Sequence, residues 1–333
     1  MTAERLVAKG KGILAADESS PTIKKRFDTI NVASTEENRR AYRELLFTSP
    51  DIGKFISGVI LFDETLRQSS QAGAPFPKLL SDLGVLPGIK VDEGAKPMAG
   101  FDGEKITEGL DGLRDRLSEY RELGARFAKW RAVITIAHAL PTQANLEANA
   151  HALARYAALC QEAGIVPIVE PEVLMDGGHD IDRCEVVTSR TLKVVFNALY
   201  DHRVLLEGML LKPNMVISGL DCKDQAGVEE VAERTVSCFR QVVPAAVPGI
   251  VFLSGGQNSR HATAHLNAMN ALGDHPWELS FSYGRALQED TLNTWKGDTA
   301  MVEKAQRVFR HRAECNSAAR SGAYHDGMET MTQ

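Results

Sequence analysis

A lysine at the end of an apolar run is the residue whose type and position most clearly indicate catalytic chemistry in this chain. Residues 205–214 read LLEGMLLKPN, with Lys212 as their only cation. The run predicts a buried strand over Leu205–Pro213, and Pro213 ends its ladder, so Lys212 should lie at the carboxyl end of the strand. Burial disfavours the charged form of an amine. Because a neutral amine can attack a carbonyl carbon and form a Schiff base, covalent amine catalysis is our first hypothesis.

Other charged residues fall at or near the carboxyl ends of further predicted strands. The i, i+2 spacing within two pairs of them can aim both members of each pair at one side of a sheet. Any single member could be a solvated strand-end charge, but their convergence on one mouth favours a functional site. Lys212, Glu170 and Asp17 would serve as nucleophile, acid/base and base. The full set is Asp17, Lys90, Asp92, Lys129 with Arg131, Glu170 with Glu172, and Lys212.

Two small-residue turns that open helices predict a phosphate site. One includes Ser254 and Gly255, and the other includes Gly284 and Arg285. Backbone N–H groups at a helix N-terminus hold phosphate, and an arginine adds a bidentate donor. The loop after the first predicted strand, residues 19–22, runs into the basic residues 24–26 and is a candidate for a second phosphate.

Short apolar runs alternate with helically spaced segments along the whole chain, which is typical of parallel strands joined by helices. Eight such units match a closed (β/α)₈ barrel. An open doubly wound sheet is the alternative, but it would want a Gly-rich turn where residues 15–18 read AADE. The predicted strands are Gly12–Asp17, Ser57–Glu64, Gly88–Asp92, Trp130–Ala137, Ile165–Val173, Leu205–Pro213, Gly249–Gly255 and Glu278–Gly284. The predicted helices are Leu110–Phe127, Asn145–Cys160, Val186–Tyr200, Val228–Val242, His261–Leu272, Arg285–Thr294 and Met301–Ala319.

The composition is that of a globular enzyme. The 333 residues are 44% apolar and 25% charged, with a net charge of −6, which argues against nucleic acid or an anionic membrane as the main partner. The five cysteines are scattered, which fits a reducing compartment, and no long apolar stretch indicates a secretory signal or a membrane span. We therefore expect a cytoplasmic protein with one barrel domain over 1–320 and a mobile tail over 321–333. Four prolines between positions 75 and 97 indicate a loop-rich decoration of the barrel.

A metal centre is a minor hypothesis. His261 and His265 share an i, i+4 spacing, but the sequence shows neither a His-Glu-x-x-His pattern nor an evident third ligand. We therefore expect no metal and no other cofactor.

Ten segments, in order along the chain from about residue 5 to about 320, resemble class I (Schiff-base) fructose-bisphosphate aldolase. They include GILAADES at 12–19, FAKWR at 127–131 and PIVEPE at 167–172. The others are TEENRR at 35–40, VILFDET at 59–65, GIKVD at 88–92, LLEG at 205–208, LKPNM at 211–215, FLSGGQ at 252–257 and FSYGRALQ at 281–288.

The resemblance implies reversible cleavage of fructose 1,6-bisphosphate to dihydroxyacetone phosphate and glyceraldehyde 3-phosphate, in glycolysis and gluconeogenesis, by a homotetrameric lyase. It implies that Lys212 forms the Schiff base, that Glu170 is the acid/base and that Asp17 takes the C4 hydroxyl proton. Glu172 would orient Lys212, and Lys129 would assist cleavage. Further substrate contacts are implied for Lys90 and Arg131, for the ketone-end phosphate cradle Ser254, Gly255, Gly284 and Arg285, and for the second-phosphate candidates Ser19, Thr22, Lys25 and Arg26.

The chain departs from the family pattern at two places. Thr22 and Pro21 stand where the family commonly has serine and glycine. Many members end in a tyrosine that moves protons at C3, whereas the last tyrosine here is Tyr324; either it acts from an internal position, or another group or water does. The alternatives left open are fructose 1-phosphate as substrate, a scaffold or cytoskeleton-binding role, and a metal-dependent aldolase.

Overall fold

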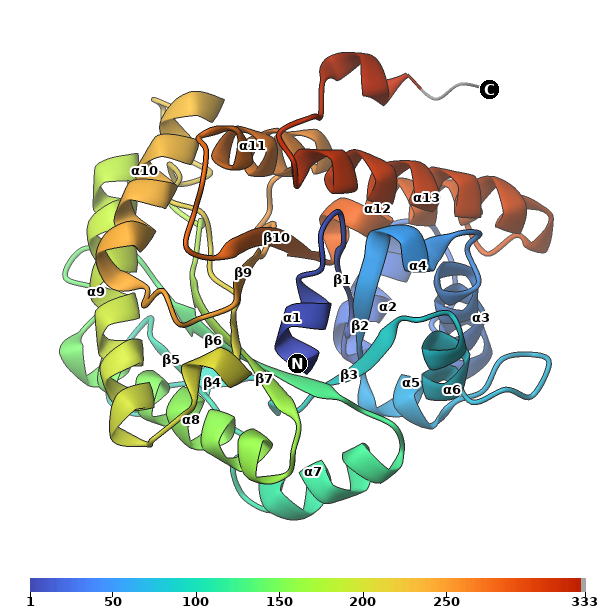
Figure 1. The fold of residues 1–333 in the computed structure, drawn as a ribbon, viewed down its shortest axis with the longest axis horizontal. Coiled ribbons are helices and arrows are strands. Elements are labelled where there is room, and N and C mark those ends of the chain that lie inside the picture. Colours follow the sequence, from blue (N-terminus) through green and yellow to red (C-terminus); the bar gives the residue numbers. More distant parts are fainter. Residues whose placement is uncertain (331–333) are drawn as a thin grey trace.

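The computed structural model describes residues 1–330, and eight parallel strands close a barrel in it (Figure 1). The strands are β1 (Gly12–Ala16), β2 (Ile56–Leu61), β3 (Leu86–Lys90), β6 (Phe127–Ile134), β7 (Val166–Val173), β8 (Leu210–Leu211), β9 (Gly249–Phe252) and β10 (Glu278–Tyr283). They pair around the ring in the order β1-β10-β9-β8-β7-β6-β3-β2. The predicted (β/α)₈ barrel is confirmed.

Helices surround the ring of strands. Side-chain caps mark the starts of some of them, including α8 and α9: Thr142 accepts a hydrogen bond from the backbone N of Asn145, and Asp180 accepts one from that of Arg183. The helices are α1 (Thr2–Leu6), α2 (Ser20–Asp28), α3 (Glu36–Phe47), α4 (Ile52–Phe55), α5 (Asp63–Arg67), α6 (Phe76–Asp82), α7 (Leu113–Glu122), α8 (Gln143–Glu162), α9 (Ile181–Asp201), α10 (Val228–Val242), α11 (Ser259–Ala271), α12 (Arg285–Trp295) and α13 (Val302–Ala319).

Helix α1 plugs the amino end of the barrel, and Figure 1 shows it in the centre of the ring. Its Leu6 joins an interior cluster with Phe127 of β6 and other inward-facing strand residues. A Cβ at Gly88 of β3 would lie 2.3 Å from the Phe127 ring, so only glycine leaves room for that ring. The open carboxyl end is therefore the one available for a site.

Arg320, just after α13, ties the last helix to this plug. Its guanidinium donates to the carbonyl oxygens of Ala8 at 2.9 Å and Lys11 at 2.5 Å, and pairs with Glu278 at 2.5 Å. Nearby, the Ser280 hydroxyl on β10 donates to the Lys11 carbonyl at 2.9 Å. The first and last parts of the fold are thus joined at the base of the barrel.

The strand predicted over Leu205–Pro213 is wrong in its first half. Residues Leu206–Gly208 form a 3₁₀ turn, and only β8 joins the barrel ladder. The side chain of Gln161 takes the place of a ladder neighbour, since its Oε1 accepts from the Leu205 backbone N at 2.9 Å and its Nε2 donates to the Leu205 carbonyl at 2.7 Å. Backbone pairing resumes where the chain is buried, and Lys212 N donates to the Val169 carbonyl at 2.8 Å.

The stretch predicted as loop-rich, between residues 75 and 97, contains the unpredicted helix α6, together with β3, which overlaps the strand predicted over Gly88–Asp92. Pro77 lies in the first turn of α6, where its missing N–H costs nothing, and Pro87 lies within β3 with its carbonyl accepting from Arg126 N. A further hairpin, β4 (Ala95–Pro97) with β5 (Lys105–Thr107), was not predicted. The side chain of Asn149 on α8 holds it by donating to the Lys105 carbonyl at 2.9 Å.

The part of the tail that the structure describes, residues 321–330, contacts α11 and α13. The Tyr324 hydroxyl donates to Glu329 at 2.8 Å, and Glu329 pairs with Arg312 of α13 at 2.6 Å. Residues 331–333 lie outside the described residues, so the mobility expected for 321–333 stays a prediction. Among residues 1–330, no helix is both long and apolar enough to cross a membrane.

Candidate active site

A cavity of about 500 Å³ opens at the carboxyl ends of the barrel strands. The structure brings all the predicted site residues except Lys25 and Asp92 to its walls. Lys25 is exposed on α2 and lines a neighbouring cavity that shares Thr22, Arg26 and Arg285 with this one. The residues gathered here are Asp17, Ser19, Thr22, Arg26, Lys90, Lys129, Arg131, Glu170, Glu172, Lys212, Ser254, Gly255, Gly284 and Arg285.

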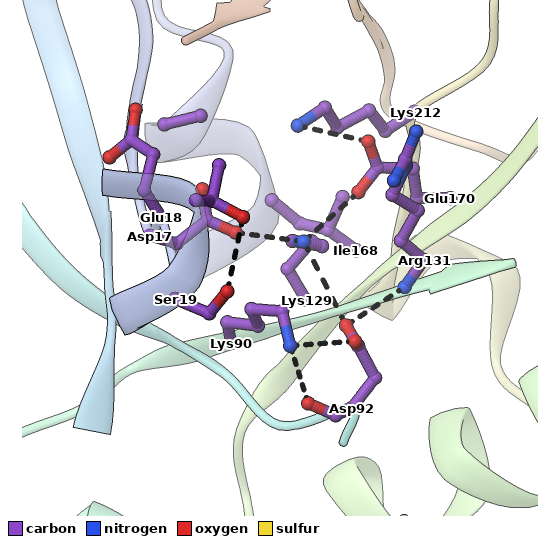
Figure 2. A network of polar contacts seen from close by, with 12 residues as sticks. Asp17, Glu18, Ser19, Lys90, Asp92, Lys129, Arg131, Ile168, Glu170 and Lys212 are labelled. Carbon is purple, nitrogen blue, oxygen red and sulfur yellow. Dashed lines mark hydrogen bonds and ion pairs between the residues drawn. The ribbon is translucent and has the colours of Figure 1, made fainter. Parts of the chain in front are cut away.

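Lys129 lies at the centre of the charged network (Figure 2). Its Nζ is 2.8 Å from Asp17, 3.4 Å from Glu170 and 3.8 Å from Asp92. Burial opposes the charged amine, but these three carboxylates outweigh it and raise the pKa of Lys129 above the ordinary value. Lys129 is therefore held as a cation and is a poor nucleophile.

Lys212 is the second buried amine, and it has a different environment. Its side chain is 5% exposed. Among residues 1–330 it forms one ion pair, in which Nζ lies 3.2 Å from Oε1 of Glu170. The other oxygen of Glu170 faces Lys129 at 3.4 Å, so the carboxylate bridges the two lysines (Figure 2). A proton on the Lys212 amine thus has one nearby carboxylate to receive it.

Asp17 follows β1 and lies near Lys90 of β3, Lys129 of β6 and Lys212, which follows β8. Burial alone would raise the pKa of its carboxyl group, but Lys129, Lys212 and Lys90 together hold the pKa well below its usual value. Asp17 therefore stays ionised at neutral pH, which is the form that can accept a proton.

A second set of ion pairs lines the other side of the mouth. Lys90 Nζ lies 2.7 Å from Asp92, whose other oxygen accepts from the Arg131 backbone N at 3.2 Å. The Arg131 guanidinium pairs with Glu172, and the Arg131 side chain is 43% exposed. Strand register brings Arg131 near Glu172. Arg131 of β6 lies opposite Glu170 of β7, and Glu172 is two positions further along β7.

Asn214 holds the segment after Lys212 against β7. Its Oδ1 accepts from the Val173 backbone N at 3.1 Å, and its Nδ2 donates to Thr188 of α9 at 3.0 Å. The Pro213 carbonyl accepts from the backbone N of Leu253, just after β9, at 3.1 Å. These bonds fix Lys212 although β8 itself is only two residues long.

The turn after β9, where an anion cradle is predicted, has a left-handed residue. Gly255 has a φ of +54°, and a Cβ there would lie 2.9 Å from the Leu253 side chain, so the position favours glycine. The Gln257 backbone N donates to the Ser254 carbonyl at 3.0 Å, which closes the turn. Gln257 Oε1 in turn lies 2.5 Å from Nδ1 of His265 on α11.

The environment of His265 predicts a pH-dependent loss of stability. Burial, then the nearby His261, lowers the pKa of His265 from 6.5 to about 4. Between these values the unfolded chain binds a proton that the native protein does not, so unfolding becomes easier as the pH falls from 6.5 toward 4. At pH 5 the loss should be about 2 kcal/mol relative to pH 7.5.

Urea denaturation at pH 7.5 and pH 5 measures this loss, with His265→Gln as the matched variant. The wild type should lose about 2 kcal/mol more between the two pH values than the variant does. Equal losses in both proteins would mean that His265 does not remain neutral in the fold.

The cavity also contains residues that sequence reasoning missed, among them Glu18, Asp176, Leu220 and Ser282. Glu18 is next to Asp17 within the motif at 12–19, but no spacing rule distinguishes it there. Asp176 and Leu220 belong to loops whose path depends on the whole barrel, so the sequence carries no local signal for them.

Tyr324 lies away from this cavity. Its backbone N donates to Asn267 of α11 at 2.9 Å, and its hydroxyl is bonded to Glu329. Within residues 1–330, no group of three or more His, Cys, Asp or Glu side chains could hold a metal ion. The rings of His261 and His265 are 6.2 Å apart, and His265 is directed at Gln257.

The barrel and its charged mouth define a (β/α)₈ enzyme with a buried amine at the carboxyl ends of the strands. Comparison with known proteins narrows this class. The family described as glycolytic fructose-bisphosphate aldolase class-I matches residues 1–333. The chain therefore belongs to the class I fructose-bisphosphate aldolase family and is a lyase.

Similar proteins and a similar structure agree with this membership. The chain is 60% identical to a probable class 1 fructose-bisphosphate aldolase of Xanthomonas campestris, with 97% of both chains covered. It is 55% identical to the fructose-bisphosphate aldolase of Dictyostelium discoideum, over 97% of this chain and 91% of that one. A structure of the Plasmodium falciparum aldolase, in complex with TRAP and a small-molecule inhibitor, superposes with a TM-score of 0.97 at 54% identity, covering 98% and 94% of the two chains.

Proposed function

We propose that the protein reversibly cleaves fructose 1,6-bisphosphate to dihydroxyacetone phosphate and glyceraldehyde 3-phosphate through a Schiff base on Lys212. Membership of the aldolase family and the names of its relatives support the substrate. The observation that supports a Schiff base on Lys212 is the difference in surroundings between the two buried lysines, Lys129 and Lys212. Lys129 is surrounded by three carboxylates and held charged, whereas Lys212 contacts Glu170 at 3.2 Å.

Schiff-base formation uses Lys212 and Glu170. The neutral amine attacks C2 of the open-chain ketose, and a new C–N bond forms as the carbonyl π bond breaks. One proton leaves the nitrogen, and the carbonyl oxygen takes one proton to become a hydroxyl group. That hydroxyl then takes a second proton and leaves as water, which gives an iminium ion. Glu170, within reach of Nζ, is placed to relay these protons.

Cleavage then uses Asp17 and Lys129. The ionised Asp17 takes the proton of the C4 hydroxyl, the C3–C4 bond breaks, and its electron pair moves into the iminium to give an enamine while the aldehyde departs. Lys129, 2.8 Å from Asp17, stabilises the negative charge that develops on the C4 oxygen. The enamine takes a proton at C3, and water releases dihydroxyacetone phosphate and restores the amine.

The remaining cavity residues bind and orient the phosphates in this proposal. The Ser254–Gly255 turn and the start of α12 at Gly284 and Arg285 offer backbone N–H groups and a guanidinium to the ketone-end phosphate. Lys90 and Arg131 add positive charge across the mouth. Glu172, for which the resemblance implies a role in orienting Lys212, is paired with Arg131 and would orient that side chain. Ser19, Thr22, Lys25 and Arg26 are the candidates for the second phosphate.

Borohydride trapping tests the covalent step directly. The protein is incubated with dihydroxyacetone phosphate, reduced with borohydride, digested and analysed by mass spectrometry. The adduct mass should appear on the peptide that contains Lys212, and a parallel sample without the ketose should lack it. An adduct on another lysine, or none at all, would refute the mechanism.

We further propose the cytoplasmic homotetramer that the family resemblance implies. Large apolar side chains on α9 support an assembly, because Tyr200 is 81% exposed and Val186 is 59% exposed. The molar mass measured by light scattering gives the oligomeric state.

A further inference from the structure

Glu18 is a buried carboxylate at the cavity wall to which the mechanism above gives no role. Its side chain is 4% exposed and lies between two guanidinium groups. Arg26 of α2 pairs with one oxygen, and Arg43 of α3 lies 2.7 Å from the other. Gln288 of α12 donates to the first oxygen at 3.1 Å. Glu18 thus connects three helices directly beside Asp17.

The two arginines bound to Glu18 face different surroundings. The Arg43 side chain is 3% exposed, so its charge depends on Glu18 for compensation. The Arg26 side chain is 24% exposed and lines the active-site cavity. A Cβ at Gly284 would lie 3.7 Å from Nη2 of Arg26, so the free end of this guanidinium reaches the start of α12.

Glu18 is itself held rigidly. Gln288 Nε2 also donates to the Ala15 carbonyl of β1 at 2.8 Å, which joins Glu18 to the strand that leads to Asp17. Burial alone would raise the pKa of Glu18, but Arg26 and Arg43 offset this and hold the pKa below its usual value. The carboxylate therefore stays charged and can orient Arg26 throughout the neutral range.

We propose that Glu18 is a positioning residue, which holds Arg26 at the cavity wall beside Gly284 so that its free nitrogen binds a substrate phosphate. Without this pair, Arg26 would be a long side chain with several rotamers, and ordering it would cost binding free energy. The inference rests on the proposed function, because the bisphosphate is the ligand that Arg26 would bind.

A purely structural role is the competing explanation, since Arg43 also depends on Glu18. The two explanations differ in whether Arg26 is needed for the effect. If Glu18 acts through Arg26, Glu18→Gln weakens substrate binding only while Arg26 is present. If Glu18 acts through the fold, the effect is the same with or without Arg26.

A double-mutant cycle of Glu18→Gln and Arg26→Ala measures this difference. KM and kcat for fructose 1,6-bisphosphate are determined for the four proteins, and Kd is determined by calorimetry with Lys212→Met added to each. Glu18→Gln should raise KM and Kd about tenfold while kcat changes less than about twofold. In the Arg26→Ala background, Glu18→Gln should raise neither constant.

Adding Arg43→Met to Glu18→Gln provides the control for folding. Removing the unpaired buried charge should recover the thermal midpoint while KM stays high. The proposal is overturned if Glu18→Gln raises KM and Kd equally in both Arg26 backgrounds, if it raises neither, or if Arg43→Met restores them. A wild type that binds the bisphosphate but does not cleave it would refute the proposed function, and the Kd cycle would still decide the role of Glu18.

Discussion

Replacing Lys212 by methionine is expected to reduce cleavage of fructose 1,6-bisphosphate by roughly 10⁴-fold or more, because the covalent intermediate is lost. Methionine keeps a similar length and apolar character but has no amine. The substrate should still bind, since the phosphate contacts remain, and borohydride trapping of dihydroxyacetone phosphate should disappear. A coupled assay for glyceraldehyde 3-phosphate gives kcat and KM.

Lys304→Met is the matched control for this prediction. Lys304 is exposed on α13, so its loss should leave kcat, KM and trapping unchanged. Substantial residual turnover of Lys212→Met, with trapping at a different lysine, would assign the nucleophile elsewhere. Lys129 would be the first candidate, and its three carboxylate partners make that outcome unfavourable.

Glu170→Gln is expected to lower kcat by about 10²- to 10⁴-fold, because the amide cannot carry protons between the carbinolamine and the leaving water. The isosteric change also removes the negative charge between Lys212 and Lys129, which lie 3.2 and 3.4 Å from its oxygens. KM should change much less than kcat, since the phosphate contacts are on other strands.

Single-turnover trapping shows whether Glu170 acts in Schiff-base formation or in a later step. If Glu170 relays protons in Schiff-base formation, the rate of trapping should fall in parallel with kcat. Glu314→Gln, an exposed change on α13, controls for the substitution itself. A low kcat with normal trapping would place Glu170 in a later step, and normal kcat would remove it from the mechanism.

The barrel and most of the residues that line the cavity could be predicted from the sequence, because both depend on local patterns. Each buried strand is a short apolar run, and the carboxyl ends of parallel strands necessarily meet at one mouth. Lys212 was located because a cation at the end of such a run is unusual. That reasoning placed Lys212 correctly at the mouth even though half of the predicted strand forms a 3₁₀ turn.

What the sequence did not predict depends on contacts between distant residues. Gln161 satisfies the backbone of Leu205 from 44 positions away, which no periodicity reveals. The pairing of Glu18 with Arg43 depends on how α3 packs against the end of β1. The contrast between Lys129 and Lys212 likewise arises from the number of carboxylates near each amine, which only the closed barrel determines. Their roles in catalysis stay predictions.

The joined ends at the base of the barrel constrain the order in which the protein can mature on the ribosome. The ring closes only when β1 pairs with β10, and the Ser280–Lys11 contact at that seam spans 269 positions. Arg320 adds its bonds to the plug later still, after nearly the whole chain has been synthesised. A nascent chain that still lacks β10 must therefore wait with unpaired edges on β1 and β9, which makes the late part of translation the period of greatest vulnerability to aggregation.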